Sequence, residues 1–159
     1  FKAVPNPAVF ENAHSTIRYR IAWTVGSESV DDEVQFFIDK INIITEFFPE
    51  LSWVREMYAT KSLLRHEQGH FDLAELLRND ITEKIKKTFA GKLYHTIGKN
   101  DDQCKQYARE HSGRLLYEVL KKHQAHLDEQ RSQYDKMTNF GENEHEQAVY
   151  DARFLNLRE

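Results

Sequence analysis

The N-terminal third of the chain has the pattern of apolar and polar residues that is typical of half-buried β-strands. Within residues 15–25 every second side chain is apolar, and these positions are Ile17, Tyr19, Ile21, Trp23 and Val25. Residues 26–32 predict a turn. Residues 33–48 are again rich in β-branched and aromatic side chains, so they predict one long strand, or two strands broken near Asp39-Lys40.

The rest of the chain has helical periodicity. Helices are predicted over residues 58–89, from Asp101 to about residue 134, and over residues 144–157. We expect Asp101 to cap the second helix, a weak point near Ser112-Gly113, and a loop over residues 138–143. Because strands come first and helices follow, the predicted fold class is α+β, with a small antiparallel sheet packed against one long helix and two further helices. We expect residues 1–159 to form a single domain.

Composition and charge narrow the classes of function. A chain of 159 residues, of which 40% are hydrophobic, can bury one core. The formal net charge is −4, and lysine and arginine are scattered, so the sequence has no basic patch of the kind that binds nucleic acid. No apolar run approaches the length of a membrane span. The single cysteine, Cys104, excludes an internal disulfide and a cysteine-rich metal site.

The most informative motif is His66-Glu67-Gln68-Gly69-His70, which lies within the first predicted helix. Residues four apart share one face of a helix, so His66 and His70 can bind the same metal ion. Glu67 can then act as the general base on a metal-activated water without being a ligand itself. This HExxH pattern is typical of zinc metalloproteases, and it predicts Zn²⁺ as cofactor and hydrolysis of a peptide or similar bond.

The residues that flank the motif place the two histidines on the buried face of the helix. The stripe at helical spacing consists of Leu63, His66, His70, Ala74 (or Leu73) and Leu77. An imidazole that is buried without a partner costs about 1–3 kcal/mol. A shared metal ion therefore explains the pair better than two separately hydrogen-bonded core histidines do.

Three segments together resemble one bacterial family, known as domain of unknown function 922 and predicted to contain zinc-dependent proteases. They are Pro49-Glu50-Leu51-Ser52-Trp53-Val54, then residues 63–75, close to the family core HEQ-x-HFD-x-AE, and residues 133–141 followed by Gln147. The resemblance implies a metallopeptidase-like fold built around a zincin-type active-site helix. It also implies a peptide or protein substrate and a periplasmic, envelope-associated or secreted protein.

The third segment departs from the family pattern at one position. The family usually has Tyr-Asp-x-x-Thr-x-His-Gly, and its histidine is an attractive third ligand, but this chain has Phe140 there. A catalytic zinc site has three protein ligands and a water. The residues that could supply the third bond are His145, which we prefer, then Glu142, Asp135, and His123 together with His126. Asp135 could instead support a ligating imidazole through a hydrogen bond.

Tyr134 precedes the predicted loop and could stabilise the oxyanion that forms when water attacks a carbonyl, or it could equally be a core tyrosine. The leading hypothesis is therefore a zinc-dependent peptidase-like hydrolase. Its catalytic residues are Glu67 and Tyr134, and its metal ligands are His66, His70 and His145. The alternative is a catalytically degenerate, non-enzymatic envelope or binding domain with a partial metal site, and Phe140 is its main support. A closed structural zinc site would leave Glu67 without a purpose.

Overall fold

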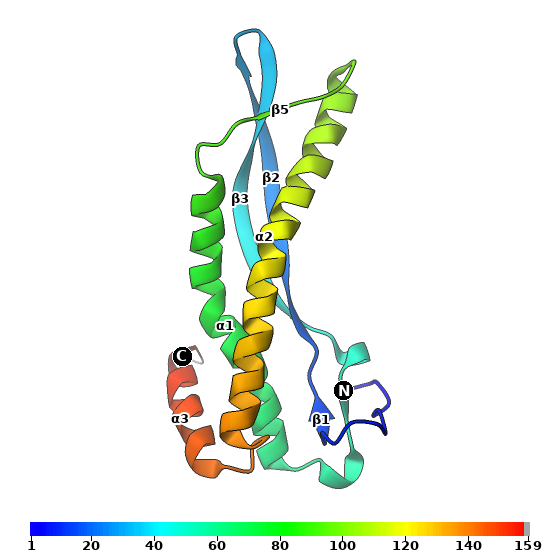
Figure 1. The fold of residues 1–159 in the computed structure, drawn as a ribbon, viewed down its shortest axis with the longest axis vertical. Coiled ribbons are helices and arrows are strands. Elements are labelled where there is room, and N and C mark those ends of the chain that lie inside the picture. The colour runs from blue at the N-terminus through cyan, green and yellow to red at the C-terminus, as the bar shows by residue number, and fades with distance from the viewer. Residues whose placement is uncertain (158–159) are drawn as a thin grey trace. The chain divides into compact units, whose positions relative to one another are not determined.

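The computed structural model describes residues 1–157, and its fold class is α+β, as the sequence predicts (Figure 1). Five strands and three α-helices follow one another, with short 3₁₀ turns between some of them. The strands are β1 (Ala13–His14), β2 (Ile17–Val30), β3 (Glu33–Phe47), β4 (Trp53–Val54) and β5 (Tyr94–His95). The helices are α1 (Lys61–Phe89), α2 (Asp101–Thr138) and α3 (Glu144–Phe154). No helix within residues 1–157 combines the length and the apolar character needed to cross a bilayer.

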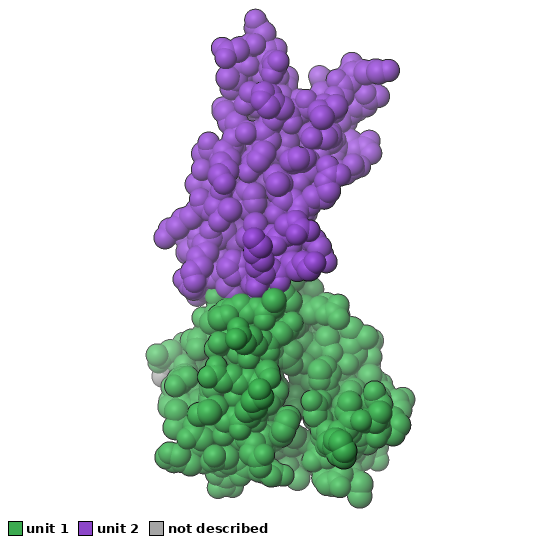
Figure 2. Space-filling model, in the orientation of Figure 1, with its two compact units in different colours: residues 1–19, 45–78, 124–159 green, residues 20–44, 79–123 purple. Residues whose placement is uncertain are grey.

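The chain divides into two compact units, which lie within what the sequence predicts to be one domain (Figure 2). Unit 1 contains residues 1–19, 45–78 and 124–159, and unit 2 contains residues 20–44 and 79–123. Both α1 and α2 contribute residues to each unit. The sheet of order β2-β3-β5 lies mostly in unit 2, and its antiparallel β3–β5 register pairs Gln35 with His95 and Phe36 with Tyr94.

The turn between β2 and β3 is shorter than the predicted turn over residues 26–32. Strand β2 continues to Val30, and only Asp31 and Asp32 connect it to β3. Their φ angles are +51° and +65°, so both central residues have the left-handed conformation that tight hairpins need. Aspartate tolerates this conformation, so the turn needs no glycine, and the predicted turn begins too early, at Gly26. Strand β3 is unbroken, although Lys40 has a φ of +50° at the predicted weak point.

Helix α2 runs without interruption through Ser112-Gly113, where the sequence predicts a weak point. The Ser112 hydroxyl donates to the Arg109 carbonyl at 3.0 Å and accepts from the Trp23 indole at 3.0 Å, so its polar group is fully used. An added Cβ on Gly113 would lie 3.5 Å from the Trp23 ring, an ordinary contact distance, so the packing of this ring does not require glycine there. The helix begins after Asn100, whose side chain accepts from the Gln103 amide at 3.0 Å, so Asn100 rather than the predicted Asp101 provides this cap.

Unit 1 combines a short two-stranded sheet with parts of three helices. In the sheet, β1 pairs with β4 in antiparallel register, Ala13 with Val54 and His14 with Trp53. Helix α1 starts at Lys61, after Thr60, whose hydroxyl accepts from the Leu63 amide at 3.1 Å. The predicted start at residue 58 falls instead in a 3₁₀ turn, Glu56–Tyr58. A core cluster of Leu73, Tyr134 and Phe154 contains one residue from each helix.

Candidate metal centre

His66, Glu67 and His70 lie on the buried face of α1. The exposed fractions of His66 and His70 are 1% and 4%, and Glu67 is buried beside them. Leu73 and Ala74 continue the same face into the core, as the helical spacing predicts. The sequence therefore places three polar groups in the interior of unit 1, where each requires a partner.

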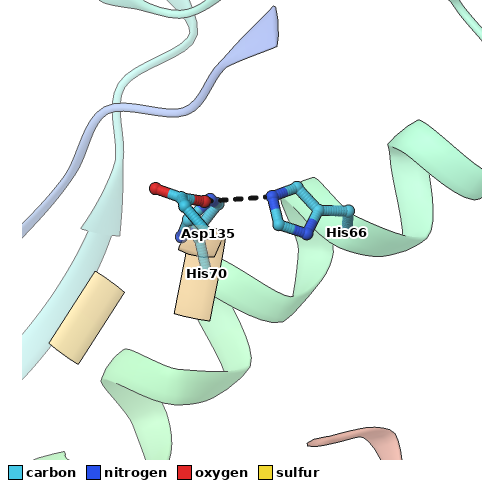
Figure 3. Close-up of side chains that lie close together, drawn as sticks. All are labelled: His66, His70 and Asp135. Carbon is cyan, nitrogen blue, oxygen red and sulfur yellow. Dashed lines mark hydrogen bonds and ion pairs between the residues drawn. The ribbon is translucent and has the colours of Figure 1, made fainter. Parts of the chain in front are cut away.

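Asp135 on α2 is the partner that both histidines share (Figure 3). Its Oδ1 atom lies 3.1 Å from Nε2 of His66 and 3.0 Å from Nε2 of His70. Two atoms that bind one zinc ion tetrahedrally, with bonds of about 2.0 Å, are about 3.3 Å apart. Within residues 1–157 these three side chains form a group whose potential ligand atoms all lie within 4.8 Å of one another. We refer to His66, His70 and Asp135 as the His-His-Asp cluster.

The surroundings of His66 suit a metal ligand. Its Nδ1 atom lies 3.3 Å from Oε1 of Gln147 and 3.3 Å from Oγ1 of Thr138. The Thr138 hydroxyl donates its own proton to the Tyr134 carbonyl at 2.7 Å, so toward His66 it can only accept. A proton is therefore best placed on Nδ1, which leaves the lone pair of Nε2 facing the Asp135 carboxylate. A cation between these two atoms would remove that repulsion.

The surroundings of His70 are different. Arg131, one helical turn before Asp135 on α2, donates from Nε to Nδ1 of His70 at 3.3 Å. An arginine cannot accept, so Nδ1 carries the lone pair and Nε2 carries the proton that points at Asp135. If Nε2 bound a metal, Nδ1 would carry the proton and two donors would face each other. Metal binding by His70 therefore requires Arg131 to give up this hydrogen bond.

Burial and mutual attraction set the charges of the cluster. Burial lowers the pKa of His70 to about 4, which keeps the imidazole neutral and able to act as a ligand. Burial alone would raise the pKa of Asp135, but its close contacts with His66 and His70 hold it well below its usual range. Burial also lowers the pKa of the Arg131 guanidinium. The cluster thus presents two imidazoles and one carboxylate.

Glu67 lies next to the cluster and is held by Ser15. The Ser15 hydroxyl, in the segment between β1 and β2, donates to Oε2 of Glu67. Burial raises the pKa of Glu67, and the Ser15 hydrogen bond opposes that rise only in part. A carboxylate with a raised pKa is a stronger base than an exposed one, so this environment suits a general base. Arg131 donates to the carbonyl of Ser15, which links the same segment to α2.

Tyr134 packs against His66. The two rings are stacked with centroids 4.6 Å apart and an interplanar angle of 10°. The Tyr134 hydroxyl donates to the His66 carbonyl at 3.1 Å and accepts from the Gln147 amide at 2.8 Å, and the side chain is fully buried. Gly69 makes room for it, because an added Cβ would lie 2.1 Å from the hydroxyl oxygen. This position favours the core-tyrosine hypothesis, and an oxyanion role for Tyr134 stays a prediction.

The other candidates for the third ligand do not belong to the His-His-Asp cluster. His145 is exposed on α3, and Glu142 is exposed in the preceding loop, where it accepts from the Asn139 side chain at 2.8 Å. His126 is exposed near Glu129, and His123 lies in unit 2. Asp135 is one of the predicted alternatives to His145, whereas Ser15 and Arg131 are not among the predicted site residues. The spacing of Arg131 and Asp135, four apart on one helix, is the signal that could have linked Arg131 to the site.

Two cavities meet at the site. The larger, of about 790 Å³, is lined by His66 and Glu67 together with the segments around residues 8–13, 57–63 and 139–142. The smaller, of about 340 Å³, contains all three residues of the cluster, Glu67 and Arg131. His66, Glu67 and Phe140 line both cavities. A ligand that enters the larger cavity therefore reaches both His66 and Glu67.

Comparison of the chain with family models, with curated proteins and with solved structures gives no match.

Proposed function

We propose that this chain is a zinc-dependent peptidase-like hydrolase whose metal is held by His66, His70 and Asp135. The observation that carries the proposal is the position of one Asp135 oxygen, 3.1 Å and 3.0 Å from the two Nε2 atoms, with the Glu67 carboxylate buried beside them. Two imidazoles and one carboxylate form a donor set that catalytic zinc sites use, with a further position left for water. The resemblance to the family named above belongs to the same proposal, with its periplasmic, envelope-associated or secreted location.

The choice of zinc and hydrolysis depends on Glu67. Two histidines and one carboxylate also hold iron(II) in oxygenases, but that chemistry needs no carboxylate base beside the ligands. When bound, zinc would supply Lewis acidity, which polarises a carbonyl and makes water a nucleophile at neutral pH. Glu67, with its raised pKa, is placed to accept a proton from the attacking water and to return it to the leaving amine. Ser15 holds one oxygen of Glu67, which fixes the direction of the carboxylate.

The alternative, a non-catalytic binding domain with a partial metal site, drew its support from Phe140 at the position of the family histidine. With Asp135 of the same segment as the proposed third ligand, the proposal does not need a histidine at position 140. A structural site with a fourth protein ligand is less well supported, because the group found within residues 1–157 has three members. The hydrolase proposal therefore accounts for more of the buried polar residues than either alternative does.

The first test is the stoichiometry and affinity of zinc. The protein is stripped with a chelator and titrated with Zn²⁺ against a chromophoric competitor. We expect one zinc per chain, and Asp135→Ala should weaken binding by about 100-fold or more, since it removes a direct ligand. His145→Ala is the matched control and should leave the affinity unchanged. If wild-type protein binds no zinc, or if His145→Ala weakens binding as much as Asp135→Ala does, the proposed site is wrong.

The second test separates metal binding from chemistry. Zinc-loaded wild type and Glu67→Gln are compared on a mixture of quenched-fluorescence peptides. We expect Glu67→Gln to bind zinc within a few-fold of wild type but to lose about 10²–10⁴-fold in kcat/KM, the contribution that a general base makes. Equal rates for the two proteins would contradict the hydrolase proposal even if zinc binds.

A further inference from the structure

We propose that Arg131 is a further catalytic residue, which stabilises the oxyanion that forms on the substrate carbonyl when water attacks. This inference rests on the proposed hydrolase function and adds to the same site a positive charge that its imidazoles and carboxylates do not supply. Arg131 lies on α2, one helical turn before Asp135. It lines the smaller cavity together with Glu67 and all three residues of the His-His-Asp cluster.

The guanidinium of Arg131 has donors that the protein does not use. An arginine carries five N–H donors. Among the described residues, Nε donates to Nδ1 of His70 at 3.3 Å, and Nη2 donates to the carbonyl of Ser15. Within residues 1–157 the one buried side-chain nitrogen or oxygen without a partner is Thr45 Oγ1. Nη1 of Arg131 makes no hydrogen bond to these residues, so it must be accessible, and its protons are available to a ligand in the smaller cavity.

Ser15 places this cation beside the base. The Ser15 hydroxyl donates to Oε2 of Glu67, and the Ser15 carbonyl accepts from Nη2 of Arg131. The base and the guanidinium are therefore held by one residue, and all three line the same cavity. Attack of water on a carbonyl needs both groups, because the base takes a proton from the water while negative charge collects on the carbonyl oxygen.

Tyr134, for which the sequence predicts the oxyanion role, is less well placed for it. Its side chain is fully buried, its hydroxyl donates to the carbonyl of His66, and it lines neither of the two cavities. Arg131 keeps its charge, since a guanidinium is not deprotonated in proteins. Burial lowers the pKa of Arg131, but the carboxylates of Asp135 and Asp128 oppose that effect.

The protons and electrons balance as in amide hydrolysis. The water oxygen bonds to the carbonyl carbon and gives one proton to Glu67, while the carbonyl π electrons move onto the oxygen. Arg131 donates hydrogen bonds to that oxygen and stays protonated. When the electrons return, the C–N bond breaks and the leaving nitrogen takes the proton from Glu67. Because the full negative charge exists only during the reaction, Arg131 should affect the rate more than substrate binding.

The experiment compares two peptide analogues that are blocked at both ends. One is a phosphinic peptide, whose tetrahedral anion resembles the oxyanion, and the other is its ketomethylene isostere, whose carbonyl is neutral. Their affinities for the zinc-saturated protein are measured by calorimetry. Arg131→Gln should reduce the preference for the phosphinic peptide by about 10-fold to 100-fold, since it removes charged donors to an anion. Lys136→Gln removes an exposed positive charge of α2 outside both cavities, so it is the matched control and should keep the preference.

Two further measurements distinguish catalysis from a structural role. Arg131→Gln should lower kcat by about 10²–10³-fold, as the loss of an oxyanion donor does, and a loss confined to KM would overturn the oxyanion role. In the wild type, which does not depend on the folding of a variant, phenylglyoxal modification is mapped to each arginine by mass spectrometry. At saturation, the phosphinic peptide should protect Arg131 at least about threefold better than its isostere does. An unreactive Arg131, or equal protection by both compounds, would contradict the proposal.

The outcomes separate this inference from the proposed function. If peptides are cleaved but Arg131→Gln keeps both kcat and the phosphinic preference, Arg131 has no catalytic role and the hydrolase proposal stands. If the preference is lost in Arg131→Gln but no peptide is cleaved by the wild type, the anion site stands and the hydrolase proposal fails. If Arg131→Gln weakens only a second pair of analogues with a free C-terminal carboxylate, Arg131 binds the end of the substrate and the oxyanion role is overturned. If the protein does not bind zinc, both proposals fall together.

Discussion

The interiors of the two units are built from different kinds of residue. Among the described residues, unit 2 buries an almost wholly apolar set, with Thr82 and Ser112 as its buried polar members. Its buried apolar residues are Phe36, Ile38, Ile41, Ile43, Ile81, Ile85, Phe89, Ala108, Leu116 and Leu120. Unit 1 also has an apolar core, but beside it a polar set is buried that consists of Ser15, Ser52, His66, Glu67, His70, Asp72, Thr138 and Gln147. Polar groups cost free energy when buried, so their concentration in one unit indicates a function there.

The polar interior of unit 1 is supported by hydrogen bonds. Within residues 1–157, Thr45 Oγ1 is the one buried side-chain oxygen or nitrogen without a hydrogen-bond partner. Such networks are stable only while each member keeps its partner and its charge. The stability of unit 2 should therefore depend mainly on packing volume. The stability and zinc affinity of unit 1 should depend on pH, on bound metal and on whether hydrogen-bond donors are exchanged for acceptors.

The largest expected effect is the loss of packing in unit 2. Phe36 is fully buried, and its ring contacts Tyr94 and His111. Phe36→Ala should reduce the free energy of unfolding by about 3–5 kcal/mol, because it removes a large apolar side chain and leaves a cavity. The change is measured by urea denaturation. Under native conditions zinc affinity should stay within about threefold of wild type, and a larger fall would show that the two interiors are not independent.

The next effect is the response of metal-free unit 1 to acid. The pKa of His70 is about 4 in the folded protein and near 6.5 when unfolded, so between these values only the unfolded state binds the proton. Stability should therefore fall as the pH decreases from 6.5 to 4, by about 3 kcal/mol for this residue. Asp135, whose pKa is lowered, loses its contribution only at more acidic pH, below its ordinary value.

Glu67 affects the pH dependence of stability in the opposite direction to His70. Its pKa is raised, so just above its ordinary value the folded state holds the proton and stability increases as the pH decreases. Glu67→Gln removes this opposing contribution, and urea denaturation of that variant between pH 7 and pH 4 should show the full loss due to His70. A flat stability profile for Glu67→Gln would contradict the buried neutral state of His70.

The contrast between the units also explains what the sequence could predict. Periodicity identified the two long strands and the three helices, since the alternation in residues 17–25 and the helical stripe through Leu73 and Ala74 reflect burial directly. The two-residue strands β1, β4 and β5 were not predicted, because they are too short to show a period. The sequence pattern made the hairpin turn too long, because the turn was predicted over residues 26–32 and the structure confines it to Asp31 and Asp32. It also predicted a weak point at Ser112, whose hydroxyl is satisfied by Trp23, a residue distant in sequence.

The sequence could predict only those residues of the candidate site that lie close together along the chain. His66, Glu67 and His70 lie on one helical turn, so their spacing alone indicated a shared metal. Asp135 reaches them from another helix, and no spacing rule ranks it above His145. Ser15 is 52 positions from Glu67, and only the folded chain brings them together. Residues that complete a site across elements are positioned by tertiary packing, which leaves little trace in one sequence.

A smaller effect is expected from the acceptor behind His66. Gln147→Leu removes the amide oxygen that lies 3.3 Å from Nδ1, and zinc affinity should fall about 10-fold to 100-fold, as it does when such supporting acceptors are lost. Thr138 can still accept from the same atom, so the lower end of this range is expected. Gln147→Glu keeps an acceptor and should retain the wild-type affinity. Equal losses in both variants would mean that packing against Tyr134, rather than the acceptor, is what Gln147 provides.

The smallest expected effect is an increase in zinc affinity, and it concerns Arg131. Its guanidinium donates to Nδ1 of His70 and adds positive charge beside the proposed cation site. Arg131→Gln offers an oxygen that can accept from Nδ1 and removes the charge, so zinc affinity should rise by about tenfold, or about 1.4 kcal/mol. Arg131→Lys keeps the charge without an acceptor and should stay near wild type. If Arg131→Gln instead binds zinc more weakly, the bond from Arg131 to Ser15 matters more than the conflict at His70. A rise in the zinc affinity of Arg131→Gln would show that Arg131, as part of the buried polar network of unit 1, weakens zinc binding by the three proposed ligands.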